Sequence, residues 1–134
     1  SPINLHQDAR DESHLFRHTF LNVVNETHQQ DDLVFITEKT YRSINSCRPF
    51  VINGDRGSLK YLKDIGFKTF DQFWDESYDQ ETSDHARISK IVDIVTQITS
   101  RTEDELLNLF QNMLPILEHN YKVLKSYNQW NTLN

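Results

Sequence analysis

The sequence is poor in the residues that mark the commoner kinds of active site. Cys47 is the only cysteine, so these 134 residues cannot form an internal disulfide, which favours a reducing, cytoplasmic setting. The three glycines form neither a G-x-G-x-x-G nor a Walker-type loop, and there is no G-x-S-x-G or C-x-x-C motif. No apolar run approaches the length of a membrane span, and no charged-then-apolar leader opens the chain. These absences exclude the glycine-loop, nucleophile-elbow and C-x-x-C sites that such motifs define.

Histidine and cysteine also offer little. The six histidines are scattered, so a metal site built from His28, His85 or His119 is a weaker interpretation than histidines at the surface. Cys47 falls on the apolar stripe of an expected helix, which indicates a small buried hydrophobic residue rather than a nucleophile. We therefore expect neither a metal nor a cofactor.

Charge is distributed unevenly along the chain. The net charge is −6, yet the segment 34–68 holds seven basic and three acidic residues, a balance of +4, and the remainder carries −10. A locally basic segment in an acidic protein suits a small anionic ligand better than a long nucleic acid. The alternative interpretation is a set of solvated lysines on helix surfaces.

The apolar pattern predicts an α/β fold in a single domain, 1–134. We expect a polar arm over 1–14, an α/β core over 15–80 and C-terminal helices over 81–134. Residues 20–24 have the β-branched and aromatic content of a strand, and the uninterrupted apolar run 50–52 is typical of a strand covered on both faces.

The connecting segments carry helix signals. Thr37 is a good N-cap for a helix that begins at Glu38, and Pro49 bars its continuation. Ser58 is expected to cap the next helix, and Gly66 to end it in a left-handed conformation. Further along the chain, the pattern indicates a third short strand, 67–70.

Two apolar stripes with a helical period follow residue 84 and predict a pair of long helices. The first stripe consists of Ile88, Ile91, Val92, Val95 and Ile98. The second consists of Leu106, Leu107, Phe110, Met113, Leu114, Leu117, Tyr121 and Leu124. Pro115 is expected to kink the second helix or to split it. The whole pattern predicts a small parallel sheet with flanking helices and a C-terminal helical pair.

The triplet Thr37-Glu38-Lys39 is the best candidate for chemistry. A helix N-terminus has backbone N–H groups without partners and a positive dipole, and it readily receives phosphate. A lysine in the first turn is unfavourable for the helix itself, because it places a cation at the positive end of the helix dipole. A bound anion beside it would make the electrostatic contribution of this lysine favourable. Glu38 can accept two hydrogen bonds from a vicinal diol. The plainer interpretation is a capped helix with incidental charges.

The run 34–54 (VFITEKTYRSINSCRPFVING) resembles the donor-binding segment of fucosyltransferase-like glycosyltransferases of the two-domain GT-B class. That segment has an aromatic and an aliphatic residue before Thr-Glu-Lys, then a helix, a Pro-led apolar strand and a glycine. The resemblance covers about residues 19–80. Over this wider run the sequence looks like bacterial and phage glycosyltransferases of the same type. This resemblance implies the Rossmann-like, C-terminal half of a GT-B fold.

The resemblance implies roles for several residues in binding the donor. Glu38 would bind donor hydroxyls, Lys39 would pair with the diphosphate, and the aromatic Phe35 would lie against the donor. Arg17, upstream of the first strand, is a candidate for a second phosphate contact, and Asn25 matches an Asn at the end of the strand in the relatives. Arg56 is a further candidate from its charge alone.

The implied reaction is displacement at an anomeric carbon, with a nucleoside diphosphate as the leaving group, so a nucleotide-sugar is the expected substrate. The general base comes from the acceptor-binding half in such enzymes, so no catalytic residue is assigned here. Because the first residue is Ser1 rather than Met, we expect processing, a tag scar or the excision of a domain. Possible partners are an N-terminal acceptor domain or a second copy of the chain.

Other interpretations remain open. The chain can be a non-catalytic α/β interaction module that associates through its C-terminal helices. A receiver-like or flavodoxin-like domain is disfavoured, because Asn25-Glu26 is a poor substitute for an acidic cluster. The acids of the stretch 74–79 can form an acid pair or a metal cluster: Asp75, Glu76 and Asp79. A solvated loop is favoured there, anchored by three aromatic residues that pack inward: Phe73, Trp74 and Tyr78.

Overall fold

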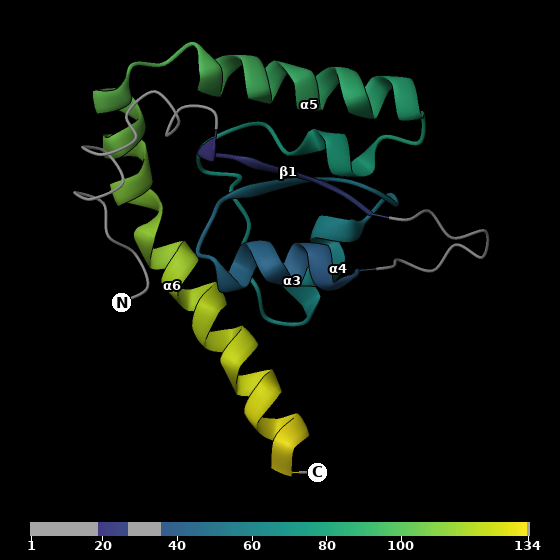
Figure 1. Ribbon diagram of the computed structural model, residues 1–134. Coiled ribbons are helices and arrows are strands. Elements are labelled where there is room, and N and C mark those ends of the chain that lie inside the picture. The colour runs from purple at the N-terminus through teal and green to yellow at the C-terminus, as the bar shows by residue number, and fades with distance from the viewer. Residues whose placement is uncertain (1–18, 27–35, 134) are drawn as a thin grey trace.

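The computed structural model describes residues 19–26 and 36–133, which form layers around a two-stranded parallel sheet (Figure 1). Strand β1 is Asn22–Asn25 and strand β2 is Phe50–Asn53, with Val23 opposite Val51. The α/β class and the parallel pairing predicted from the sequence are confirmed, although β1 begins two residues later than predicted. The expected arm, 1–14, lies outside the described residues.

Within the described residues, five helical elements surround this sheet. Two helices, α3 (Glu38–Asn45) and α4 (Ser58–Asp64), lie on one face, and α5 (Asp84–Thr99) lies on the other (Figure 1). A short 3₁₀ helix, η1 (Ser77–Gln80), packs near α4 and α5. The last helix, α6 (Glu103–Leu133), packs against α3, and its C-terminal part extends past the layers (Figure 1).

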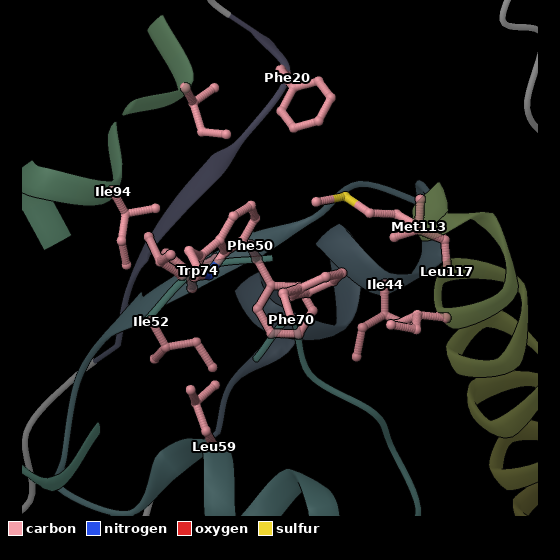
Figure 2. Close-up of a cluster of buried hydrophobic side chains, with 14 of the residues drawn as sticks. Phe20, Ile44, Phe50, Ile52, Leu59, Phe70, Trp74, Ile94, Met113 and Leu117 are labelled. Atoms are coloured by element: carbon pink, nitrogen blue, oxygen red, sulfur yellow. The ribbon is translucent and has the colours of Figure 1, made fainter. Parts of the chain in front are cut away.

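The hydrophobic core forms around β2. Phe50, Val51 and Ile52 are each at most 1% exposed, which confirms the prediction of a strand covered on both faces. Figure 2 shows Phe50 and Phe70 together in this core. Their rings pack edge to face, with 5.2 Å between the ring centroids. The predicted anchors of the acidic stretch are also placed inward: Trp74 and Tyr78 are buried and Phe73 is partly buried.

Several local signals act as the sequence predicts. Thr37 caps α3 by accepting a hydrogen bond from the Lys39 N–H at 3.2 Å, and Gly66 follows α4 with a φ of +107°. The start of α6 is a capping box, because Thr102 and Glu105 exchange hydrogen bonds between side chain and backbone at 3.0 and 3.1 Å.

The predicted third strand, 67–70, is not a strand. The buried side chain of Asn120, on α6, accepts a hydrogen bond from the Lys68 N–H at 2.8 Å and donates one to the Lys68 carbonyl at 2.9 Å. A single side-chain amide thus supplies the pairing that a neighbouring strand would give. The outer edge of β2 is closed in a similar way, because the Tyr78 hydroxyl accepts a hydrogen bond from the Ile52 N–H at 3.2 Å.

The prediction for the start of α4 is wrong, and of the two outcomes predicted at Pro115 the split is not observed, while the kink stays a prediction. Ser58 is the first residue of α4 rather than its cap, and its hydroxyl donates to the Asp55 carbonyl at 2.7 Å. Pro115 does not split α6, which is assigned as one continuous helix. Pro115 is exposed, so water can satisfy the carbonyl group that its missing N–H leaves without a partner.

The stripe predicted for the first long helix is only partly correct. Ile91 and Ile98 of α5 are buried as expected, and Ile94 joins them. Ile88 and Val92 are instead 47% and 53% exposed. Among the described residues, none of the helices combines the length and apolar character that a membrane span requires.

Replacing Asn120 with leucine tests its role as a substitute strand. Asn120→Leu removes both hydrogen bonds between the buried Asn120 side chain and the partly buried backbone groups of Lys68, so we expect the free energy of unfolding to fall by about 2 kcal/mol. Urea unfolding measures the change. The matched control is Asn112→Leu, at an exposed position of the same helix, which we expect to change stability by less than about 0.5 kcal/mol. Equal effects of the two substitutions would contradict this role.

Candidate ligand-binding site

The carboxyl ends of β1 and β2 meet the N-termini of α3 and α4, the edge at which open α/β sheets bind ligands. Glu26 directly follows β1, and its side chain is 4% exposed. Its carboxylate accepts hydrogen bonds from the Thr37 N–H at 2.6 Å, from the Thr37 hydroxyl, and from the Thr40 hydroxyl at 3.2 Å. The end of β1 is thereby tied to the first turn of α3.

The N-terminus of α4 has a similar arrangement. The Asp79 carboxylate, from η1, accepts hydrogen bonds from the N–H groups of Leu59 at 2.9 Å and Lys60 at 3.3 Å. The Asp79 carbonyl also accepts from the Gly57 N–H at 2.9 Å. Burial raises the pKa of Asp79, and the two backbone hydrogen bonds oppose that rise. A buried carboxylate therefore also faces the positive end of α4.

These contacts change the expected role of the α3 N-terminus. The sequence predicts a phosphate site made by unpartnered N–H groups and the helix dipole, with Lys39 beside them. The Thr37 N–H already donates to Glu26, and the Lys39 N–H donates to Thr37. An internal carboxylate therefore lies beside the α3 N-terminus, where an incoming phosphate was expected, and two of the N–H groups there are already used.

Lys39 borders a hollow of about 520 Å³ between β1 and α3, which we call the cationic hollow. Its lining comes from the strand and from one face of the helix: Leu21, Asn22, Val23, Val24, Asn25, Lys39, Arg42, Ser43 and Ser46. Among the described residues, the only charged side chains in this lining are those of Lys39 and Arg42, and both are positive. The Lys39 ammonium is exposed and donates to the Asn25 carbonyl at 3.3 Å. The hollow therefore favours an anion.

The backbone of β1 adds to this character. The N–H groups of Asn22 and Glu26 donate to Pro49 and Asn53 on the β2 side. Because successive residues of a strand point their backbone groups to opposite sides, those of Val23 and Asn25 face the hollow. No strand among the described residues pairs with this edge of β1. The edge thus offers backbone N–H donors beside the two cations.

Glu38 lies on a different side of α3 from Lys39. It lines a second hollow of about 720 Å³ between α3, α4 and α6, which we call the aromatic hollow. Its other lining residues are mostly aromatic or apolar, with a few polar side chains: Tyr41, Arg42, Asn45, Tyr61, Ile65, Phe67, Leu124, Lys125 and Tyr127. Consecutive helical residues are about 100° apart around the axis, so Glu38 and Lys39 face different hollows, and Arg42 borders both.

The remaining predicted site residues have different outcomes. Asn25 lines the cationic hollow, and its side-chain oxygen accepts a hydrogen bond from the Asn53 amide at 3.0 Å. Arg56 is exposed in the turn after β2 and is not among the residues that line either hollow. Arg17 and Phe35 lie outside the described residues, and their predicted roles stay predictions.

Sequence reasoning missed two features of this edge. Glu26 lies two residues after the predicted strand 20–24, which is a usable signal for a carboxylate at the sheet edge. Asp79 lies 20 residues from Leu59 along the chain and has no comparable local signal.

The described residues contain no cluster of three or more His, Cys, Asp or Glu side chains that could hold a metal ion. Within the acidic stretch, Asp75 accepts hydrogen bonds from Ser77, and Glu76 accepts from Thr69 and Phe70. Burial raises the pKa of Cys47, which makes its thiol less reactive.

No model of a known protein family, no curated protein and no solved structure matches the chain.

Neutralising Glu26 tests the link between β1 and α3. In Glu26→Gln the amide cannot accept all three hydrogen bonds, and the negative charge at the helix N-terminus is lost. We expect the free energy of unfolding to fall by about 2 kcal/mol, measured by urea unfolding. Glu38→Gln is the matched control, because Glu38 is exposed in the same turn; its effect should stay below about 0.5 kcal/mol. A Glu26→Gln variant as stable as the control would contradict the link.

Proposed function

We propose that the chain binds a nucleotide-sugar, as the donor-binding part of a two-domain glycosyltransferase of the GT-B type. The observation that carries this proposal is the cationic hollow, whose charged lining residues, Lys39 and Arg42, are both positive. A nucleoside diphosphate concentrates its negative charge on two linked phosphates. A pair of neighbouring cations beside backbone N–H donors is suited to that group.

The polar residues that line the cationic hollow are suited to the sugar parts of a nucleotide-sugar. The Asn25 side chain is exposed there, and the Asn22 amide donates to the Ser43 hydroxyl at 3.0 Å. Amide and hydroxyl groups can both donate and accept hydrogen bonds, as recognition of ribose or hexose hydroxyls requires. The volume of about 520 Å³ is within the range of small-molecule sites. The resemblance of 34–54 to donor-binding segments supports the same assignment.

In the proposed reaction, the acceptor oxygen forms a bond to the anomeric carbon as the bond to the nucleoside diphosphate breaks. Negative charge develops on the leaving diphosphate, where Lys39 and Arg42 would stabilise it. The proton of the acceptor hydroxyl passes to a carboxylate base from an acceptor domain, which is a proposed partner of this chain. On this proposal, the chain alone binds the donor but transfers little sugar.

Nucleotide titration tests the proposal. With GDP or UDP at about ten times its dissociation constant, we expect the melting temperature to rise by about 5 °C, because the ligand stabilises the folded state. Lys39→Ala removes one of the two cations and should weaken binding about tenfold or more. Lys122→Ala, at an exposed position of α6 away from the hollow, is the matched control and should keep the full shift. No shift with either nucleotide, or an unchanged shift in Lys39→Ala, would contradict the proposal.

A second candidate function is an interaction module that associates through its C-terminal helices. The observation in its favour is on α5, where Ile88 and Val92 are one helical turn apart and 47% and 53% exposed. Exposed apolar side chains in one row are suited to a partner surface.

Light scattering over a range of protein concentrations tests this second function. It predicts a mass that rises with concentration and returns to that of a monomer in the double variant Ile88→Ser, Val92→Ser, because the variant removes the apolar row. Both side chains are exposed, so the variant should keep its melting temperature. A monomer at every concentration would contradict association of the chain with itself.

A further inference from the structure

The aromatic hollow has the composition of a binding site distinct from the cationic hollow. Four of its lining residues are aromatic: Tyr41, Tyr61, Phe67 and Tyr127. Phe67 is buried at 3% exposure, whereas Tyr61 and Tyr127 are 38% and 45% exposed. The rings therefore run from the protein interior to the surface, and the outer ones are accessible to a ligand.

The wall of the hollow is well fixed. Tyr127 donates a hydrogen bond from its hydroxyl to the Ile65 carbonyl, which ties α6 to the end of α4. The ring of Phe67 lies 6.2 Å from those of Tyr41 and Tyr127, with interplanar angles of 44° and 39°. The three rings thus form a curved surface rather than a pair of parallel plates.

Charged groups of both signs border these rings. Glu38 and Arg42 lie one turn apart on α3, and neither side chain has a hydrogen-bond or ion-pair partner within the described residues. Lys125 also borders the hollow, with its ammonium 5.0 Å from the centre of the Tyr121 ring. Burial raises the pKa of Tyr41, so its hydroxyl keeps its proton and can donate.

This composition selects among ligand chemistries. An anionic ligand would meet Glu38, and a cationic one would meet Arg42 and Lys125. An apolar or proline-rich segment would leave these charges without partners. The ring of Phe67 is tilted by 44° and 39° against those of Tyr41 and Tyr127, so neither pair can hold a flat nucleobase between parallel faces. A neutral ligand with hydroxyl groups at its edges and C–H groups on its faces satisfies both the charges and the rings.

We propose that the aromatic hollow between α3, α4 and α6 binds a neutral carbohydrate. The C–H face of a sugar ring packs on Tyr61 and Tyr127, while Glu38 accepts hydrogen bonds from its hydroxyl groups and Arg42 donates to its oxygens. The volume of about 720 Å³ is large enough for a disaccharide. This inference does not rest on the nucleotide-sugar proposal, because Glu38 and the aromatic rings lie on a different face of α3 from Lys39, although Arg42 borders both hollows.

Titration with neutral disaccharides tests the inference. Maltose, cellobiose and lactose serve as probes, and the amide resonances of the protein are followed by NMR. We expect at least one probe to shift the amide resonances of the residues around Tyr61 and Tyr127. Saturating the aromatic protons of the protein should also transfer saturation to the bound disaccharide. Tyr61→Ala should weaken this binding about fivefold, because the stacking surface is lost. The Tyr61 side chain is exposed and forms no hydrogen bond with the described residues, so the variant should remain folded.

Two further variants keep the test decisive. Glu38→Gln preserves the shape of the side chain but weakens its acceptor, so it should also reduce affinity even if Tyr61→Ala is destabilised. Lys39→Ala should leave the binding of disaccharides unchanged, which separates this site from the nucleotide site. Val92→Ala, at an exposed position of α5, is the control for removing an apolar surface side chain. The inference is overturned if no probe shifts these resonances, if the Tyr61 and Glu38 variants bind as well as the original chain, or if GDP alone occupies the hollow.

Discussion

Glu26 is a buried carboxylate at the point where β1 ends and α3 begins, and its three hydrogen bonds to Thr37 and Thr40 hold these two elements together. A buried carboxylate is costly unless it is well hydrogen-bonded, and the positive end of a helix is a favourable place for it. The positions of Lys39, Arg42 and Glu38 all follow from the way in which this contact orients α3 on the sheet.

The same contact determines what the sheet edge can bind. Glu26 accepts the Thr37 N–H at the start of α3, and Asp79 accepts the N–H groups of Leu59 and Lys60 at the start of α4, so internal carboxylates already use some of the N–H groups that commonly bind phosphate in α/β proteins. The cationic groups Lys39 and Arg42 lie beside the helix, along the edge of β1 that no strand of the described residues pairs with. A diphosphate bound there would rest against the side of α3 rather than at its end. The aromatic hollow lies on another face of the same helix.

Much of the fold could be predicted from the sequence, because its signals are local. Thr37 caps its own helix, and the run 50–52 is buried on both faces. The errors arise where distant residues intervene. Asn120 replaces a strand beside Lys68, 52 positions away, and no local pattern at 67–70 reveals that. The candidate site was predicted as one unit because Glu38 and Lys39 are neighbours in sequence, yet helical geometry turns them toward different hollows.

The coupling between Glu26 and Thr40 tests this account most directly. The side chain of Thr40 is fully buried, and its hydroxyl donates to Glu26, so Thr40→Val removes that hydrogen bond with little change of shape. The free energy of unfolding is measured for the original chain, Glu26→Gln, Thr40→Val and the double variant. The account predicts a coupling energy of about 1 kcal/mol or more. Effects that add to within about 0.3 kcal/mol would show that the two side chains act independently, and would contradict it.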